Sequence, residues 1–179
     1  GTGSATLTAS SFTARSAGGG ALRVYGVNDL GNTEKLVLTG FATTDTILPY
    51  VTVGSAGTDF GQYSGGTIKI MTSPVDTLPG ATGSDRVKVS VNDAAHREIA
   101  ADTTVSSLIL EDGVNVTQSG AYKLTIASGG LIFGGTSTVT VNELAFGTAE
   151  GLIYNSGSAE IAAPISGSGG VTKFRDGTL

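Results

Sequence analysis

Short apolar segments alternate with glycine-containing polar segments over the last part of the chain, from Thr104 to Leu179. Each apolar segment is too short for a helix and contains β-branched or aromatic residues, so each predicts a β-strand. In order, the segments are Leu108–Leu110, Leu124–Ile126, Leu131–Phe133, Val139–Val141, Leu144–Phe146, Leu152–Tyr154 and Ile161–Ala163. This part of the chain is therefore predicted to be built from short strands.

These strands recur at a nearly constant interval. Gly130–Phe133 and Gly151–Tyr154 are offset by 21 residues, and Leu124–Ile126 and Leu144–Phe146 by 20. A period of about 20 residues is typical of a solenoid, in which each repeat buries its apolar face on the next. Two or three strands per period describe one turn of a parallel β-helix, and parallel crossovers are strongly right-handed. We therefore predict an all-β, right-handed parallel β-helix, or β-solenoid, with turns of about 20 residues.

The first 103 residues are β-rich but less regular. Alternating apolar and polar positions predict strands at Ala5–Thr8, Ala21–Tyr25, Lys35–Leu38, Ile47–Val53, Thr67–Met71 and Arg86–Val91. The second and third of these form either a hairpin or two successive turns. Pro49 cannot donate a backbone hydrogen bond, so its strand is expected at a sheet edge or to begin after the proline.

Two other segments complete this irregular part. Asn92–Asp102 is the one predicted helix, and Ser73–Ser84, with two prolines and two glycines, is a predicted loop. We see no linker long enough to separate domains. The expected organisation is one continuous domain, with residues 1–103 as irregular turns or a cap and residues 104–179 as regular turns that end in a truncated repeat.

Composition and charge narrow the possible partners. Hydrophobic residues make up 39% of the 179 residues and charged residues only 14%, which argues against disorder. The 28 glycines suit a fold that turns a corner several times per repeat. A net charge of −5 argues against nucleic acid as a partner, because phosphate binding needs a basic face. No apolar run is long enough to span a membrane.

The ends and the cysteine content bear on cellular context. The chain has no cysteine, which excludes disulfides and thiolate metal sites, and a solenoid that gains stability from stacking needs neither. It begins Gly1-Thr2-Gly3 without a methionine or a signal peptide, so we expect a fragment or a processed product. Because a strand begins near Leu179, we expect the end to cut through a longer array.

The charged residues do not form a recognisable catalytic or metal-binding pattern. Acidic residues are scattered, and the one adjacent pair, Glu111-Asp112, lies in a predicted turn that exposes both to solvent. Glu143 or Glu150 stacked near Glu160 is the alternative arrangement. His96 is the sole histidine and is predicted to lie on the surface, so neither a multi-histidine metal site nor a catalytic triad is expected. We predict no catalytic, metal or cofactor site and no enzyme activity.

Aromatic residues supply the one candidate ligand site. Tyr50, Phe60 and Tyr63 flank a glycine-containing segment, and aromatic rings stack well on sugars. The alternative is that the three rings pack against the first strands of the fold. A groove that combines an aromatic ring with two or more carboxylates would distinguish carbohydrate chemistry from a structural role.

The end of the chain resembles a known repeat. Pro164–Lys173, read as PISGSGGVTK, and Gly177–Leu179, read as GTL, are similar to the opening of the autotransporter-associated β-strand repeat. Phe174–Asp176 departs from the small residues that are usual there, and the second half of the repeat is absent. Looser similarity to the region that precedes this repeat extends over Ile47–Gly54, Asp59–Tyr63, Thr103–Leu110 and Gly113–Val116.

This resemblance implies a function class. Autotransporter passengers are right-handed parallel β-helices that are exported across the outer membrane and serve as adhesins, stalks or scaffolds. The resemblance therefore implies a non-catalytic structural, display or adhesion segment at the bacterial cell surface or outside the cell. Its expected partners are other copies of itself, neighbouring surface proteins or a polysaccharide. The alternatives are a carbohydrate-binding or carbohydrate-active β-helix and a subunit of an extracellular filament or ring.

Overall fold

A computed structural model describes residues 4–9, 18–25, 30–39, 45–54 and 58–179. The chain forms two compact units, Gly1–Thr72 and Ser73–Leu179. This division lies well before the 103/104 boundary expected from the sequence. The physical reason is that strands between residues 86 and 105 already stack on the regular turns that follow them.

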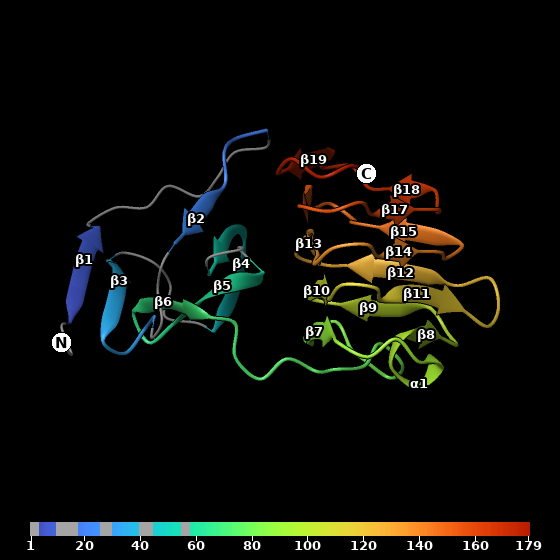
Figure 1. The fold of residues 1–179 in the computed structure, drawn as a ribbon, viewed down its shortest axis with the longest axis horizontal. Helices are drawn as coiled ribbons and strands as arrows, with labels where there is room; N and C mark the ends of the chain where they lie inside the picture. The colour runs from blue at the N-terminus through green and yellow to red at the C-terminus, as the bar shows by residue number, and fades with distance from the viewer. Residues whose placement is uncertain (1–3, 10–17, 26–29, 40–44, 55–57) are drawn as a thin grey trace. The chain divides into compact units, whose positions relative to one another are not determined.

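The first unit contains a mixed sheet (Figure 1). In spatial order its strands are β1 (Ala5–Ala9), β3 (Glu34–Leu38), β6 (Thr67–Ile70), β5 (Asp59–Ser64), β4 (Thr46–Val53) and β2 (Leu22–Val24). The pairs β1/β3 and β2/β4 are parallel, and β5 pairs with both β4 and β6 in antiparallel fashion. Strands β2 and β3 are not neighbours in this sheet, so they form neither the hairpin nor the two successive turns considered from sequence.

Strand β4 corrects a second expectation. It lies between β5 and β2 and runs continuously through Pro49, so the strand is not an edge strand of the sheet and does not begin after the proline. Its pairing with β2 covers only Val51–Val53, beyond Pro49. The pairing of β4 with β5 shifts register between Leu48 and Thr52. Proline is tolerated inside a sheet at such an irregularity, because the ladder there lacks a regular hydrogen bond for the missing N–H.

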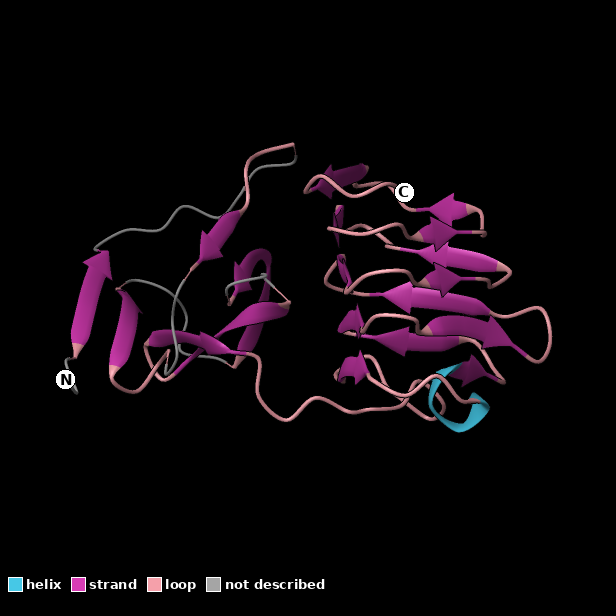
Figure 2. Cartoon of the chain, in the orientation of Figure 1, coloured by secondary structure: helices cyan, strands magenta, loops and turns pink. Residues whose placement is uncertain are grey.

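The second unit is a β-solenoid (Figure 2). Its strands follow one another in groups of three, and each group makes one turn. They are β7 (Arg86–Val89), β8 (Glu98–Ile99), β9 (Thr103–Val105), β10 (Ser107–Leu110), β11 (Asn115–Gln118), β12 (Lys123–Ile126), β13 (Gly130–Phe133), β14 (Thr138–Val139), β15 (Glu143–Ala145), β16 (Gly151–Asn155), β17 (Glu160–Ile161), β18 (Ile165–Ser166) and β19 (Val171–Phe174). About four turns of about 22 residues result, with β19 beginning the next.

Parallel pairing between turns produces three sheets (Figure 1). Their strand orders are β19-β16-β13-β10-β7, β17-β14-β11-β8 and β18-β15-β12-β9. The interior is filled by apolar side chains from all three sheets, which form one continuous cluster. The all-β class and the solenoid architecture predicted from the sequence are therefore confirmed.

The register between turns differs by one residue from the sequence alignment. Leu131 pairs with Leu108 on one side and with Ile153 on the other, whereas the 21-residue offset would have paired it with Leu152. A shift of one residue exchanges the two faces of a strand. The structure accordingly places Ile153, and not Leu152, in the interior cluster with Leu131 and Phe133.

The N-terminal end of the solenoid is covered. Val75 forms a parallel bridge with Val87 of β7, and the fully buried Leu78 packs into the solenoid core. The predicted loop over residues 73–84 therefore acts as a cap. Beside it, the predicted helix is reduced to α1 (Ala94–Arg97), because Glu98–Ile99 extends into strand β8.

Candidate functional site

The three aromatic candidates do not form a ligand platform. Phe60 is 0% exposed and Tyr63 is 2% exposed, and the Tyr63 hydroxyl donates to the Leu38 carbonyl oxygen at 2.8 Å. Tyr50 is half-buried and packs against the core of the first unit, and burial raises the pKa of its hydroxyl above 10.0. The structure thus supports the packing alternative for Phe60 and Tyr63, because a sugar cannot stack on rings enclosed by other side chains.

An exposed aromatic lies elsewhere in the same unit. Tyr25 is 69% exposed, and the Arg23 guanidinium carbon lies 5.1 Å from the centre of its ring. Tyr25 lines a hollow of about 410 Å³ between β1, β2 and β3, together with Leu7, Val24, Leu30, Glu34 and Leu36. The alternating pattern made Tyr25 the last residue of the predicted strand Ala21–Tyr25 and assigned it no role in binding. The available signal was an aromatic residue at a strand end, two residues after Arg23.

Carboxylates in the solenoid hold successive turns together. Asp112 accepts the backbone N–H of Thr136 at 2.7 Å and its hydroxyl at 2.9 Å, and these bonds lower the pKa of Asp112 below 3.8. Asp102 accepts the backbone N–H of Lys123 at 2.9 Å. In each case a side chain of one turn binds a residue of the next.

The acidic residues considered in the sequence analysis bind different partners and do not face one another. Glu111 forms an ion pair with Lys88 at 3.4 Å, whereas its neighbour Asp112 binds Thr136. Glu143 accepts the hydroxyl of Ser166, and Glu150 accepts that of Thr172. Within the described residues, no group of three or more His, Asp or Glu side chains is arranged to hold a metal ion.

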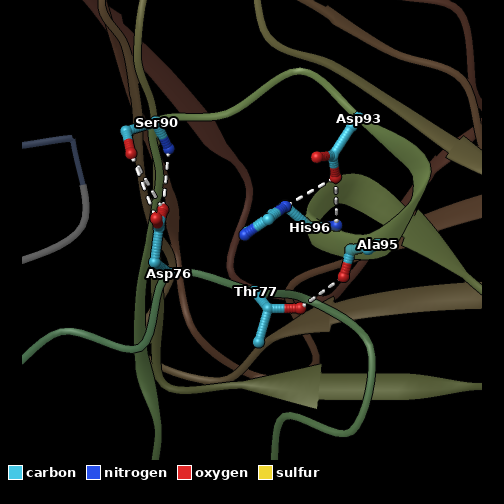
Figure 3. Close-up of polar contacts among 6 residues, drawn as sticks. All are labelled: Asp76, Thr77, Ser90, Asp93, Ala95 and His96. Carbon is cyan, nitrogen blue, oxygen red and sulfur yellow. Dashed lines mark hydrogen bonds and ion pairs between the residues drawn. The ribbon is translucent and has the colours of Figure 1, made fainter.

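A polar cluster surrounds His96 at the N-terminal end of the solenoid (Figure 3). The His96 Nδ1 atom lies 2.5 Å from the Asp93 carboxylate, and Asp93 also caps α1 by accepting the His96 backbone N–H. Hydrogen bonding to Asp93 raises the pKa of His96 above 6.5, with a smaller contribution from the charge of Asp76. The same pair lowers the pKa of Asp93 below 3.8.

This cluster ties the cap to the first turn. Asp76 accepts the Ser90 backbone N–H at 2.9 Å and its hydroxyl at 3.1 Å, and the Thr77 hydroxyl donates to the Ala95 carbonyl at 3.0 Å (Figure 3). His96 is therefore partly exposed, as expected, but it also takes part in a structural contact that the sequence analysis missed. The three-residue spacing of Asp93 and His96 was the available signal, since an aspartate at a helix N-cap binds the third residue after it.

The C-terminal turn of the solenoid exposes apolar side chains. Ile165 is 44% exposed, Val171 is 48% exposed and Leu179 is 44% exposed. Ile165 is in register with the buried Leu144, so its position continues an interior column.

Comparisons with known proteins return no relative. No family model matches the chain, and neither the curated proteins nor the solved structures contain a match. In the part of the chain that the structure describes, no helix is long and apolar enough to cross a membrane.

Proposed function

We propose that this chain is a non-catalytic structural, display or adhesion segment of a β-helical protein at the bacterial cell surface or outside the cell. One observation carries the proposal: polar side chains of the solenoid bind the backbone of the next turn. Asp102, Asp112 and Asn115 each accept a backbone N–H about one turn ahead. Side chains engaged in this way connect successive turns and stiffen the stack.

The solenoid also suits display for a mechanical reason. Each turn contacts only its neighbours, so stability accumulates along the stack and the outer surface can vary without loss of the fold. The resemblance of residues 164–179 to the autotransporter-associated repeat supports the same role and the same location. The absence of cysteine is compatible with this location.

A turnover assay tests the non-catalytic part of the proposal. Incubation of the chain with a panel of acidic and neutral polysaccharides should release no more reducing or unsaturated ends than a heat-denatured sample. The proposal is contradicted by turnover that disappears in Glu111→Gln or His96→Ala while circular dichroism shows an unchanged fold. Location is tested separately: antibodies raised against the chain should label intact cells that produce it, and labelling that requires permeabilisation would argue against a surface role.

Carbohydrate binding is the second candidate, and the exposed ring of Tyr25 favours it. The ring lines a hollow that Glu34 also lines, and ligand pockets commonly combine aromatic side chains with a small number of polar groups. A glycan array read with the wild-type chain and with Tyr25→Ala tests this candidate. Binding lost in Tyr25→Ala but kept in Tyr50→Ala would place the site at Tyr25.

A subunit of an extracellular filament or ring is the third candidate. Pairing between parallel strands, which joins the successive turns of this solenoid, can equally join strands of two chains.

A further inference from the structure

The hollow beside Tyr25 lies where the core of the first unit reaches the surface. Strands β1 and β2 are the first and last in the spatial order of the mixed sheet, yet residues of both line this hollow together with residues of β3. The sheet therefore curves, since its two outermost strands lie beside the same space. The volume of about 410 Å³ is within the range that is usual for small-molecule sites.

The walls of the hollow are mostly aliphatic. Val24, Leu30 and Leu36 line it, and all three also pack in the apolar core of the first unit. Leu7 lines it as well and is in register with Leu36 across β1 and β3. Such walls favour an apolar molecule, which gains free energy by leaving water. A sugar would bring several hydroxyl groups, each of which needs a hydrogen-bond partner when it is buried.

Glu34 determines which polar group such a molecule can carry. Side chains alternate along β3, so Glu34 lies on the same side as the core residues Leu36 and Leu38, whereas Lys35 lies on the other side and is exposed. A carboxylate has several lone-pair sites and no donor. The polar group of the ligand must therefore be a hydrogen-bond donor, such as a hydroxyl or an ammonium, because an anionic group would be repelled.

We propose that the hollow between β1, β2 and β3 binds a small apolar molecule that carries one hydrogen-bond donor, as an aliphatic alcohol or amine does. The apolar part lies against Leu7, Leu30 and Leu36, and the donor lies at the Glu34 carboxylate. This site is independent of the structural role proposed for the solenoid. It differs from the carbohydrate candidate for the same hollow, because it requires an apolar body and a single donor.

A titration followed by nuclear magnetic resonance tests the proposal on the 179-residue chain. Hexanol, hexylamine and hexanoate share one alkyl chain and differ in the polar group. Hexanol and hexylamine should shift the resonances of Leu7, Tyr25 and Leu36, and hexanoate should bind about tenfold more weakly because of repulsion by Glu34. Glu34→Gln should remove most of that difference, since a glutamine amide can donate as well as accept.

Two exposed leucines provide a matched pair of variants. Leu7, on β1, is 68% exposed and lines the hollow, whereas Leu22, on β2, is 37% exposed and is not among the lining residues. Leu7→Ser should weaken the binding of hexanol by about tenfold, because it removes part of the apolar wall. Leu22→Ser makes the same chemical change outside the hollow and should bind hexanol as the wild type does.

Three results would overturn the proposal. One is hexanoate binding as tightly as hexanol, which would show that the positive charges of Arg23 and Lys35 prevail over that of Glu34. Another is an equal loss of binding in Leu7→Ser and Leu22→Ser, or no shift at the lining residues with any of the three probes. The last is binding of glycans that depends on Tyr25 while none of the probes binds, which would leave the carbohydrate candidate in place.

Discussion

Glycine residues stack directly on one another at one corner of the solenoid. A Cβ atom at Gly157 would lie 2.7 Å from the carbonyl oxygen of Gly135, and a Cβ atom at Gly177 would overlap the carbonyl oxygen of Gly157. These glycines are one turn apart. The high glycine content of the chain therefore has a local cause here, because successive backbones approach too closely for a side chain.

Alanine substitutions can separate this crowding from backbone strain. Gly129 and Gly113 both have positive φ, at +84° and +78°, but a Cβ atom at Gly129 would overlap the Glu150 carbonyl oxygen and one at Gly113 would meet open space. We expect Gly113→Ala to lower the free energy of unfolding by about 1–2 kcal/mol, the cost of a left-handed backbone. Gly129→Ala should cost about 1–3 kcal/mol more, from overpacking.

Denaturant unfolding of the two variants measures this difference. Equal losses in both would show that the turns are not packed as closely at Gly129 as the structure has them. A larger loss in Gly113→Ala would contradict the assignment of open space beside that residue.

The His96–Asp93 pair predicts a pH dependence. The pKa of His96 is raised, so its contribution to stability is present below 6.5 and is lost as the pH rises through the raised value. The pKa of Asp93 is lowered, so its contribution is present above 3.8 and is lost as the pH falls through the lowered value. The pair therefore stabilises α1, at whose N-cap Asp93 lies, most strongly between these limits.

Nuclear magnetic resonance can follow this pair directly, because His96 is the sole histidine. We expect its ring resonances to titrate with a pKa above 6.5, and Asp93→Asn to bring the pKa down toward that value. Asp76→Asn should have a smaller effect in the same direction, because Asp76 acts only through its charge. A wild-type pKa at or below 6.5 would contradict the contact.

At the scale of the elements, amide side chains connect corners of neighbouring turns. The Asn115 backbone N–H donates to the Asn92 side-chain oxygen at 3.0 Å, and the Asn115 side-chain oxygen accepts the backbone N–H and hydroxyl of Thr138 at 3.1 and 3.0 Å. Asn115 thus joins three successive turns. Arg97 reinforces the same corner by donating to the Asn115 carbonyl oxygen and to the Thr117 hydroxyl.

Substitution at Asn115 tests whether this connection stabilises the stack. Asn115→Ala removes the acceptor for two donors and should lower the free energy of unfolding by about 1–3 kcal/mol. Asn115→Asp keeps the acceptor and should remain within about 0.5 kcal/mol of the wild type, as surface substitutions usually do. Thermal unfolding of both variants gives the comparison, and equal behaviour of the two would contradict a role for the side-chain oxygen.

The sequence predicted strand positions in the solenoid better than it predicted their pairing. Each apolar segment between Leu108 and Ile161 overlaps an observed strand, because the interior of a solenoid requires apolar residues there. The exact register was missed at Leu131 and Ile153. Paired positions of successive turns are between 20 and 23 residues apart, as Val87 to Leu108, Leu108 to Leu131, Leu131 to Ile153 and Ile153 to Lys173 show. Glycine-bounded motifs such as GLIF and GLIY look alike in either alignment.

The burial of Phe60 and Tyr63 was missed for a related reason. The sequence shows that Tyr50, Phe60 and Tyr63 lie near one another in the chain. The burial of the rings depends on strands β3, β4, β5 and β6, which come together from distant positions in the sequence. Tyr63, for example, binds the carbonyl of Leu38, which precedes it by 25 residues. Long-range contacts of this kind leave no pattern in the sequence around either residue.

At the scale of the whole chain, two units differ in how regularly they are built. Ser73–Leu179 repeats one turn, whereas the described strands of Gly1–Thr72 form a mixed sheet with both parallel and antiparallel pairs. The expectations for function, glycine packing and amide connections all depend on the same feature, the parallel register of one turn on the next.

Methyl-labelled nuclear magnetic resonance tests that register most directly. Contacts between the methyl groups of Leu108 and Leu131, and of Leu131 and Ile153, should appear as strong nuclear Overhauser effects, since these residues are neighbours in the interior column. Leu152 should show no comparable contact with Leu131. Strong Leu131–Leu152 contacts with none to Ile153, or contacts typical of antiparallel hairpins, would contradict the solenoid register and the functional proposals that rest on it.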